Sequence, residues 1–166
     1  MKNIIRLSLS LAMCALVASR SLTQELPREI LGVNLKMTKE DAQKRLREIG
    51  MFVRNEAGWQ EVWKVRDGSF SHLIVVFGKD GKLNYVTAVA AENKEAKRVE
   101  YQKIGSLKTA RQTGDVEIKN FNYQWDLPSG EDGPHTLVIA AGRDPKFLTT
   151  YSLKNLDNAP AKEEKD

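Results

Sequence analysis

Apolar residues recur at helical spacing between residues 38 and 50, on one face of an amphipathic segment. The apolar positions of this face, spaced four and three residues apart, are Ala42, Leu46 and Ile49. Thr38 precedes the run and Asp41 follows three residues later, an approximate capping box. Glycine commonly follows the last turn of a helix, and here it is Gly50. The pattern predicts a helix that begins after Thr38 and ends at Gly50.

After this helix the apolar period changes to two, which is typical of strands. Three such runs follow in meander order: "WQEVWKVRD" (59–67), "HLIVVF" (72–77) and "LNYVTAVA" (83–90). Asp80 and Gly81 stand between the last two runs, and Asp-Gly is a strong signal for a two-residue hairpin with a type I′ turn. The Gly-x-x-x-x-Gly-Lys-Ser/Thr spacing of a phosphate-binding loop is not present there.

A second helix-then-strands pattern begins after residue 100. Ser106 is placed to cap a short helix over 107–113 that ends at Gly114. The following strands are "NFNYQWDL" (120–127), with strict alternation of apolar and polar residues, "TLVIAA" (136–141) and "FLTTYSL" (147–153). Pro145 lies where Gly81 lies in the first half, and because proline cannot adopt positive φ, this turn must differ from a type I′ turn.

The two halves align with each other at offsets of 62 to 64 residues. The matched pairs are Trp63 and Trp125, His72 and His135, Gly78 and Gly142, Asp80 and Asp144, and Lys82 and Lys146. Such self-similarity favours an internal repeat. The sequence therefore predicts an α+β protein of two helix-plus-antiparallel-β-meander repeats packed as one unit. Its expected parts are a first repeat (26–91), a charged connector (92–100), a second repeat (101–155) and a disordered tail (156–166).

The first half resembles the SmpA/OmlA family of small envelope proteins, whose fold is shared with the β-lactamase inhibitory protein. The matching residues are Met37, Thr38, Glu40, Asp41, Ala42, Leu46, Gly50, Trp63, Leu73, Val75, Phe77, Gly81, Leu83 and Val86. The resemblance spans residues 32–90. It implies a protein-binding module of the cell envelope. The tandem arrangement looks more like the inhibitory protein, which in that family binds an enzyme through its sheet surface.

The N-terminus is typical of a secretory signal peptide, with Lys2 and Arg6 before an apolar run from residue 7 to residue 18. Small residues favour cleavage after Ser19, and lipid attachment at Cys14 is the less favoured alternative. We therefore expect an exported, periplasmic or secreted protein without a transmembrane segment. Removing residues 1–19 removes the only cysteine and lowers the formal charge from +4 to +2. Nothing in this charge favours a nucleic-acid partner.

The residues give little support to catalysis or to a cofactor. Motifs of serine hydrolases, zinc helices and nucleotide-binding loops are absent from the sequence. His72 and His135 occupy equivalent places in the two halves, so a paired metal or acid/base site is conceivable, but no carboxylate lies near either one at the spacing of a metal site. Asp126, Glu131 and Asp132 share a loop that we interpret as a polar hairpin connection rather than a calcium site.

The strand aromatics are the candidate partner-binding residues: Trp59, Trp63, Tyr123 and Trp125. The alternative is that they belong to the core. The runs 72–77 and 136–141 are apolar at successive positions, so both sheet faces should be covered, by the second repeat, a homodimer partner or another protein. The resulting hypothesis is a non-catalytic exported module that binds another envelope or secreted protein. The alternatives are a secreted inhibitor of a hydrolase and, as an outsider, a histidine- or metal-dependent enzyme.

Overall fold

The structure is a computed structural model that describes residues 25–56, 58–93, 96–115 and 117–158. The predicted signal peptide and all but the first three residues of the predicted tail lie outside the described residues. The elements are β1 Glu29–Ile30, β2 Val33–Asn34, α1 Lys39–Ile49, β3 Gly50–Glu56, β4 Gln60–Val65, β5 Phe70–Phe77, β6 Leu83–Ala90, α2 Tyr101–Ile104, β7 Arg111–Gln112, β8 Phe121–Leu127, β9 Thr136–Gly142 and β10 Thr150–Asn155.

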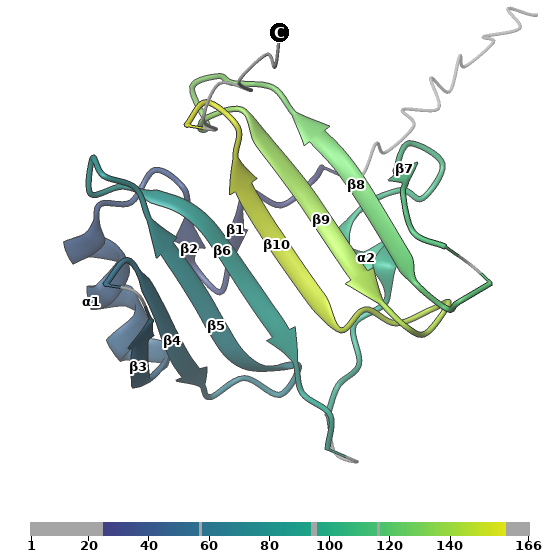
Figure 1. Ribbon diagram of the computed structural model, residues 1–166, viewed down its shortest axis with the longest axis horizontal. Coiled ribbons are helices and arrows are strands. Elements are labelled where there is room, and N and C mark those ends of the chain that lie inside the picture. The colour runs from purple at the N-terminus through teal and green to yellow at the C-terminus, as the bar shows by residue number, and fades with distance from the viewer. Residues whose placement is uncertain (1–24, 57, 94–95, 116, 159–166) are drawn as a thin grey trace, which may run out of the picture.

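Most of the described chain is β-structure, and its largest element is one antiparallel sheet of eight strands (Figure 1). The strand order is β3-β4-β5-β6-β10-β9-β8-β7, and β1 and β2 form a separate two-stranded sheet. The first half of the chain therefore supplies β3 to β6, and the second half supplies β7 to β10. The two halves meet where β6 pairs with β10, so they extend a single sheet side by side.

Helix α1 has the boundaries that the sequence predicts. The Thr38 hydroxyl accepts a hydrogen bond from the Asp41 backbone N–H at 3.2 Å, which satisfies one of the free donors of the first turn. At the other end, the Gly50 N–H donates to the Leu46 carbonyl. Ala42 and Leu46 are fully buried, so the apolar face of the helix is packed against the protein.

The predicted strands correspond to β4, β5, β6, β8, β9 and β10, although β10 begins three residues later than the apolar run. Four strands were not predicted: β1 and β2 of the small sheet, and β3 and β7 of the large one. β3 follows α1 directly at Gly50 without a loop, and β7 is only two residues long. Both are the outermost strands of the sheet.

The predicted helix over 107–113 is wrong. Helix α2 is a single turn that lies earlier, at Tyr101–Ile104, and its N-cap residue Glu100 makes no side-chain cap bond. Residues 107–109 form a turn, with the Thr109 hydroxyl donating to the Ser106 carbonyl. The chain then pairs with β8 through β7. Pairing with the sheet thus overrides the weak helical signal of this segment.

The type I′ turn that we predicted at Asp80 and Gly81 is also wrong in part. Gly81 has φ +75°, as predicted, but Asp80 does not have the positive φ that a type I′ turn requires at both central residues. The Gly81 N–H instead bonds back to the Gly78 carbonyl at 3.0 Å. Both central residues are left-handed in the β1–β2 hairpin, where Leu31 has φ 54° and Gly32 has φ 79°.

One face of the large sheet forms the core. Cross-strand pairing aligns one row of side chains over all eight strands: Phe52, Trp63, Leu73, Ala88, Tyr151, Ala140, Tyr123 and Gln112. Paired residues share a face. Helix α1, the β1–β2 hairpin and α2 all lie on this side, behind the sheet in Figure 1. Their buried side chains, including Leu46, Ile30 and Tyr101, join the same apolar cluster.

Tyr101 links α2 to the loop between β9 and β10. Its ring centroid lies 4.8 Å from that of Tyr123, and its hydroxyl donates to the Asp144 carbonyl at 3.2 Å. Burial, with smaller contributions from Tyr123 and Asp144, raises the pKa of Tyr101 to about 12. Burial also raises the pKa of Tyr151.

These tyrosines should make the protein less stable at alkaline pH. Both folded-state pKa values are raised, so the tyrosines lose their protons more readily in the unfolded state. Their contribution to the free energy of unfolding is therefore complete below pH 10 and is lost as the pH rises from there toward 12. We expect Tyr101→Phe to reduce this loss in denaturant titrations at pH 8, 10 and 11. An identical pH dependence in the variant and the wild-type protein would contradict the assignment.

Candidate protein-binding surfaces

The second face of the sheet carries an apolar surface that no described helix covers (Figure 1). Its side chains alternate with those of the core face, and pairing places them in three rows from β4 to β8. We call this surface the open face. Its apolar members are the partly exposed Ile74 and Val76 on β5, Tyr85 and Val89 on β6, and Leu137, Ile139 and Ala141 on β9, whereas Val62 of β4 lies on the same face but is buried.

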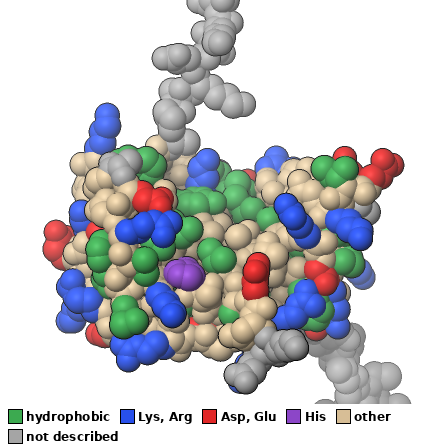
Figure 2. All heavy atoms as spheres, turned by 60° about the horizontal axis from the view of Figure 1, so that its bottom comes forward, with side chains coloured by type: hydrophobic (Ala, Val, Ile, Leu, Met, Phe, Trp, Pro, Cys, Tyr) green, Lys and Arg blue, Asp and Glu red, His purple; other side chains and the backbone are tan. Residues whose placement is uncertain are grey.

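The open face has an apolar interior and a polar rim. A polar column on β10 separates its two apolar parts, and within that column the Ser152 hydroxyl lies 3.0 Å from the Thr87 hydroxyl of β6. Lys64 lies exposed at the β4 end of one row, and Lys154 lies exposed at the end of the β10 column, between Tyr85 and Leu137. Figure 2 views this face obliquely, with hydrophobic side chains in its upper middle and Lys and Arg on both sides. An apolar centre with a polar rim is the usual anatomy of a protein interface.

The second half of the chain does not cover this face. We predicted that the second repeat would be the first candidate to do so, and this expectation is wrong because β10 pairs with β6 edge to edge. Antiparallel sheets with one solvated face normally alternate apolar and polar residues. Here β5 and β9 carry Ile74, Val76, Leu137 and Ile139 on the solvated side. No element among the described residues covers these apolar side chains, so their place on the solvated side is not explained by packing within the chain.

The four candidate aromatic residues do not form one surface. Trp63 and Trp125 are each only 3% exposed and belong to the core face, so a partner cannot contact them. The Trp63 indole N–H donates to Glu61 at 3.0 Å, and the Trp125 indole N–H donates to the Ser106 carbonyl at 2.9 Å. Tyr123 is partly buried against the same core. Of the four, only Trp59 is largely exposed, at 51%.

Trp59 belongs to a second apolar surface at the β3 edge of the sheet. Met51, Phe52 and Val53 are consecutive residues of β3 and are between 45% and 59% exposed. Trp59 lies in the turn that joins β3 to β4. We call these four residues the β3 edge patch. β3 was not predicted because its apolar residues do not alternate with polar ones.

The structure does not bring His72 and His135 together. Pairing through Val89 and Thr150 places His72 level with Ala141 of β9, six residues from His135. At the usual rise of a strand, these six residues separate the two histidines by about 20 Å along the strand direction. His135 Nε2 pairs with Asp126, and His72 Nδ1 lies 3.1 Å from the Ser71 hydroxyl. The geometry therefore offers no paired histidine site.

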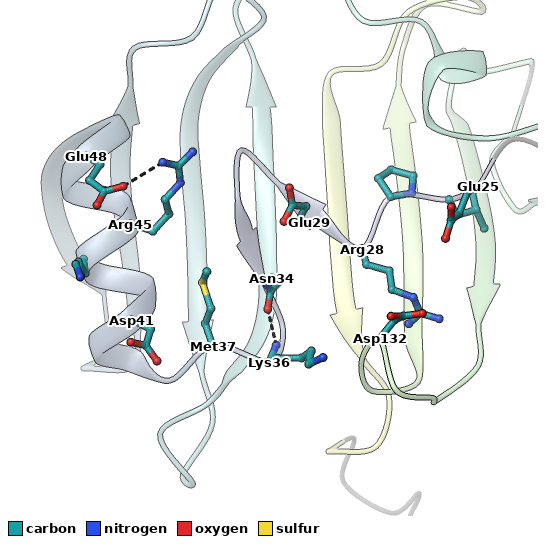
Figure 3. Close-up of a pocket in the computed structure, with 13 residues that line it drawn as sticks. Glu25, Arg28, Glu29, Asn34, Lys36, Met37, Asp41, Arg45, Glu48 and Asp132 are labelled. Carbon is teal, nitrogen blue, oxygen red and sulfur yellow. Dashed lines mark hydrogen bonds and ion pairs between the residues drawn. The ribbon is translucent and has the colours of Figure 1, made fainter.

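A groove of about 900 Å³ lies between α1, the N-terminal segment and the β8–β9 loop (Figure 3). Charged side chains of both signs line it, and several of the cations bind main-chain oxygens. Lys36 Nζ donates to the Glu131 carbonyl at 2.9 Å, Arg28 to the Pro128 carbonyl at 3.2 Å, and Arg45 Nε to the Leu31 carbonyl at 3.0 Å. These contacts fasten the β8–β9 loop and the β1–β2 hairpin to the rest of the molecule, so we assign the groove a structural role.

The same loop contains the acidic residues considered for calcium. The Asp126 carboxylate is paired with His135 Nε2, and the backbone carbonyl of Glu131 accepts a hydrogen bond from Lys36 Nζ. These two oxygens therefore already have partners. Within the described residues, no group of three or more His, Cys, Asp or Glu side chains could hold a metal ion. The loop has an isolated bridge between Gly130 and Gly133, in agreement with a polar hairpin connection.

Glu61 is a buried carboxylate that the sequence analysis did not single out. It lies on β4 beneath α1 and is 3% exposed. Gln43 Nε2 donates to it at 2.6 Å and Trp63 Nε1 at 3.0 Å, while Lys39 Nζ is 3.9 Å away. A buried carboxylate needs such partners. We interpret it as the polar contact that fixes α1 on the sheet.

A scan against models of protein families finds no match, and no curated protein and no solved structure is significantly similar to the chain. The resemblance to the SmpA/OmlA family therefore remains a prediction. Among the described residues, no helix is long and apolar enough to cross a membrane.

Proposed function

We propose that this protein is a non-catalytic, exported module that binds another envelope or secreted protein through the open face. The observation that carries the proposal is the set of seven partly exposed apolar side chains on a sheet face that no described element covers. Large exposed apolar patches on soluble domains commonly mark interaction sites. Export is supported by the signal-like N-terminus, and the envelope address by the resemblance of residues 32–90.

The open face also has the chemistry of a protein partner site rather than of a small-molecule pocket. It is a broad surface with aliphatic residues on three strands, a central pair of hydroxyl groups on Thr87 and Ser152, and a rim that includes Lys64 and Lys154. A polypeptide partner can bury such a surface. Small ligands are instead usually enclosed in concave pockets.

The proposal is tested by capture with a matched pair of variants. Immobilised protein lacking residues 1–19 is incubated at low salt with envelope extract, and bound proteins are identified by mass spectrometry. We expect Ile74→Lys with Ile139→Lys to lower capture of the specific partner at least tenfold. Ile118→Lys should retain it, because Ile118 is 73% exposed and is not part of the open face. An empty wild-type capture, or equal capture by all three proteins, would contradict the proposal.

The second candidate function is inhibition of a secreted hydrolase. It is favoured by the order of elements, in which a helix followed by four strands occurs in each half and the eight strands make one sheet. This arrangement is what the tandem resemblance to the β-lactamase inhibitory protein implies. Purified protein would then lower the activity of one enzyme in a panel of secreted hydrolases, and the Ile74→Lys and Ile139→Lys variant would not.

A further inference from the structure

The two edge strands of the sheet, β7 and β3, differ in how well they are protected from pairing with a further strand. β7 is two residues long and consists of exposed Arg111 and Gln112, which is a common way of making an edge unsuitable for further strands. β3 is seven residues long and exposes three consecutive apolar residues. A bulge at Val53 is its only interruption among the paired residues. An edge of this kind is a template for another strand.

The backbone of β3 has free hydrogen-bonding groups at defined residues. The Arg66 N–H donates to the Ile49 carbonyl and the Phe77 N–H to the Trp59 carbonyl, which fixes the alternation along β4. Residues 60, 62 and 64 of β4 therefore bond to β3, and residues 61, 63 and 65 bond to β5. It follows from the register that Phe52 and Asn55 of β3 direct their N–H and C=O groups toward the free edge, whereas the N–H of Gly50 is already bonded to the Leu46 carbonyl.

We propose that the β3 edge pairs with the β3 edge of a second copy of this chain, in antiparallel register about a two-fold axis at Asn55. This surface is separate from the open face and goes beyond the proposed function. Arg54 and Glu56 flank Asn55 with opposite charges and already pair within the strand at 2.6 Å. In the antiparallel dimer, each Arg54 lies opposite Glu56 of the second copy, so the strand is complementary to itself.

The apolar residues follow the same symmetry. In this register Phe52 and Met51 extend past Glu56 of the second copy toward the β3–β4 turn that carries Trp59, so the two β3 edge patches approach each other. Each of the four side chains is about half exposed. At about 100 Å² each, they would bury on the order of 800 Å² in the pair, to which the backbone and the charged residues add. That total is at the low end for specific interfaces, so we expect a dissociation constant of about 10 to 100 µM.

Sedimentation of protein lacking residues 1–19, from about 1 µM to 1 mM, tests the dimer and its register. The wild-type protein should show a monomer–dimer equilibrium. Arg54→Glu alone and Glu56→Arg alone should each weaken the dimer about tenfold, because like charges then lie opposite one another. An equimolar mixture of the two variants should recover it, because every Glu then faces an Arg.

The mixture separates the proposal from a general loss of stability, since a folding defect is not repaired by mixing. Val53→Lys should also weaken the dimer, whereas Ile118→Lys and the Ile74→Lys with Ile139→Lys variant should not. A monomer at every concentration would overturn the proposal. So would a dimer that the open-face variant abolishes and the β3 variants leave intact. Capture of a partner on the open face is a separate readout, so either proposal can fail alone.

Discussion

Replacing Trp125 by alanine should lower the free energy of unfolding by about 3 to 5 kcal/mol. The indole is 3% exposed, lies in the core cluster, and donates from Nε1 to the Ser106 carbonyl at 2.9 Å. The substitution removes a large buried side chain and leaves that carbonyl without its partner. Because domains of this size are stable by about 5 to 15 kcal/mol, much of the folding free energy should be lost in guanidinium titrations.

The matched control is Trp59→Ala. Trp59 is 51% exposed and lies in the β3–β4 turn, so its removal should change the free energy of unfolding by about 0.5 kcal/mol or less. If both substitutions had equal effects on stability, the separation of these tryptophans into a core residue and a surface residue would be wrong. Trp59→Ala should instead weaken the proposed dimer, because the side chain belongs to the β3 edge patch.

The elements that the sequence predicts well are those with local signals. Thr38 and Gly50 bracket an amphipathic segment, and the strict alternation from Phe121 to Leu127 indicates a half-buried strand. α2 has neither kind of signal, because it is a single turn without a side-chain cap. Ser106, in contrast, resembles a cap but precedes a turn, and the chain pairs with β8 from Arg111, five residues later. The structure of that region is determined by its pairing with β8 rather than by its local sequence.

The binding surfaces were less predictable because they depend on which strands become neighbours. Alternation shows that Trp63 and Trp125 share a face with other apolar residues, but it does not show which face the helices cover. The β6–β10 pairing, which leaves the open face uncovered, joins residues more than 60 positions apart. β3 is an edge strand with a bulge at Val53, so its side chains do not follow a period of two. That β3 is an exposed edge strand is evident only from the strand order of the sheet.

Gly50→Ala should destabilise the protein by about 2 to 3 kcal/mol. Gly50 ends α1 and begins β3 with no intervening loop, which brings its backbone against β4. A Cβ atom there would lie 2.3 Å from the Lys64 carbonyl oxygen and 3.2 Å from the Val65 Cα. Both are backbone atoms, so neither can move aside as the end of a flexible side chain could. The strand must shift, and with it the residues of the β3 edge patch.

Gly130→Ala is the control, since nothing lies within 4 Å of the Cβ position and its φ is not left-handed. It should change the free energy of unfolding by about 0.5 kcal/mol or less in the same titration. The proposed dimer adds a second readout, because a displaced β3 no longer presents Phe52 and Asn55 to a second copy. Gly50→Ala should therefore weaken dimerisation even at temperatures where the monomer stays folded. Wild-type stability in this variant would show that α1 and β3 are not joined as closely as the structure indicates.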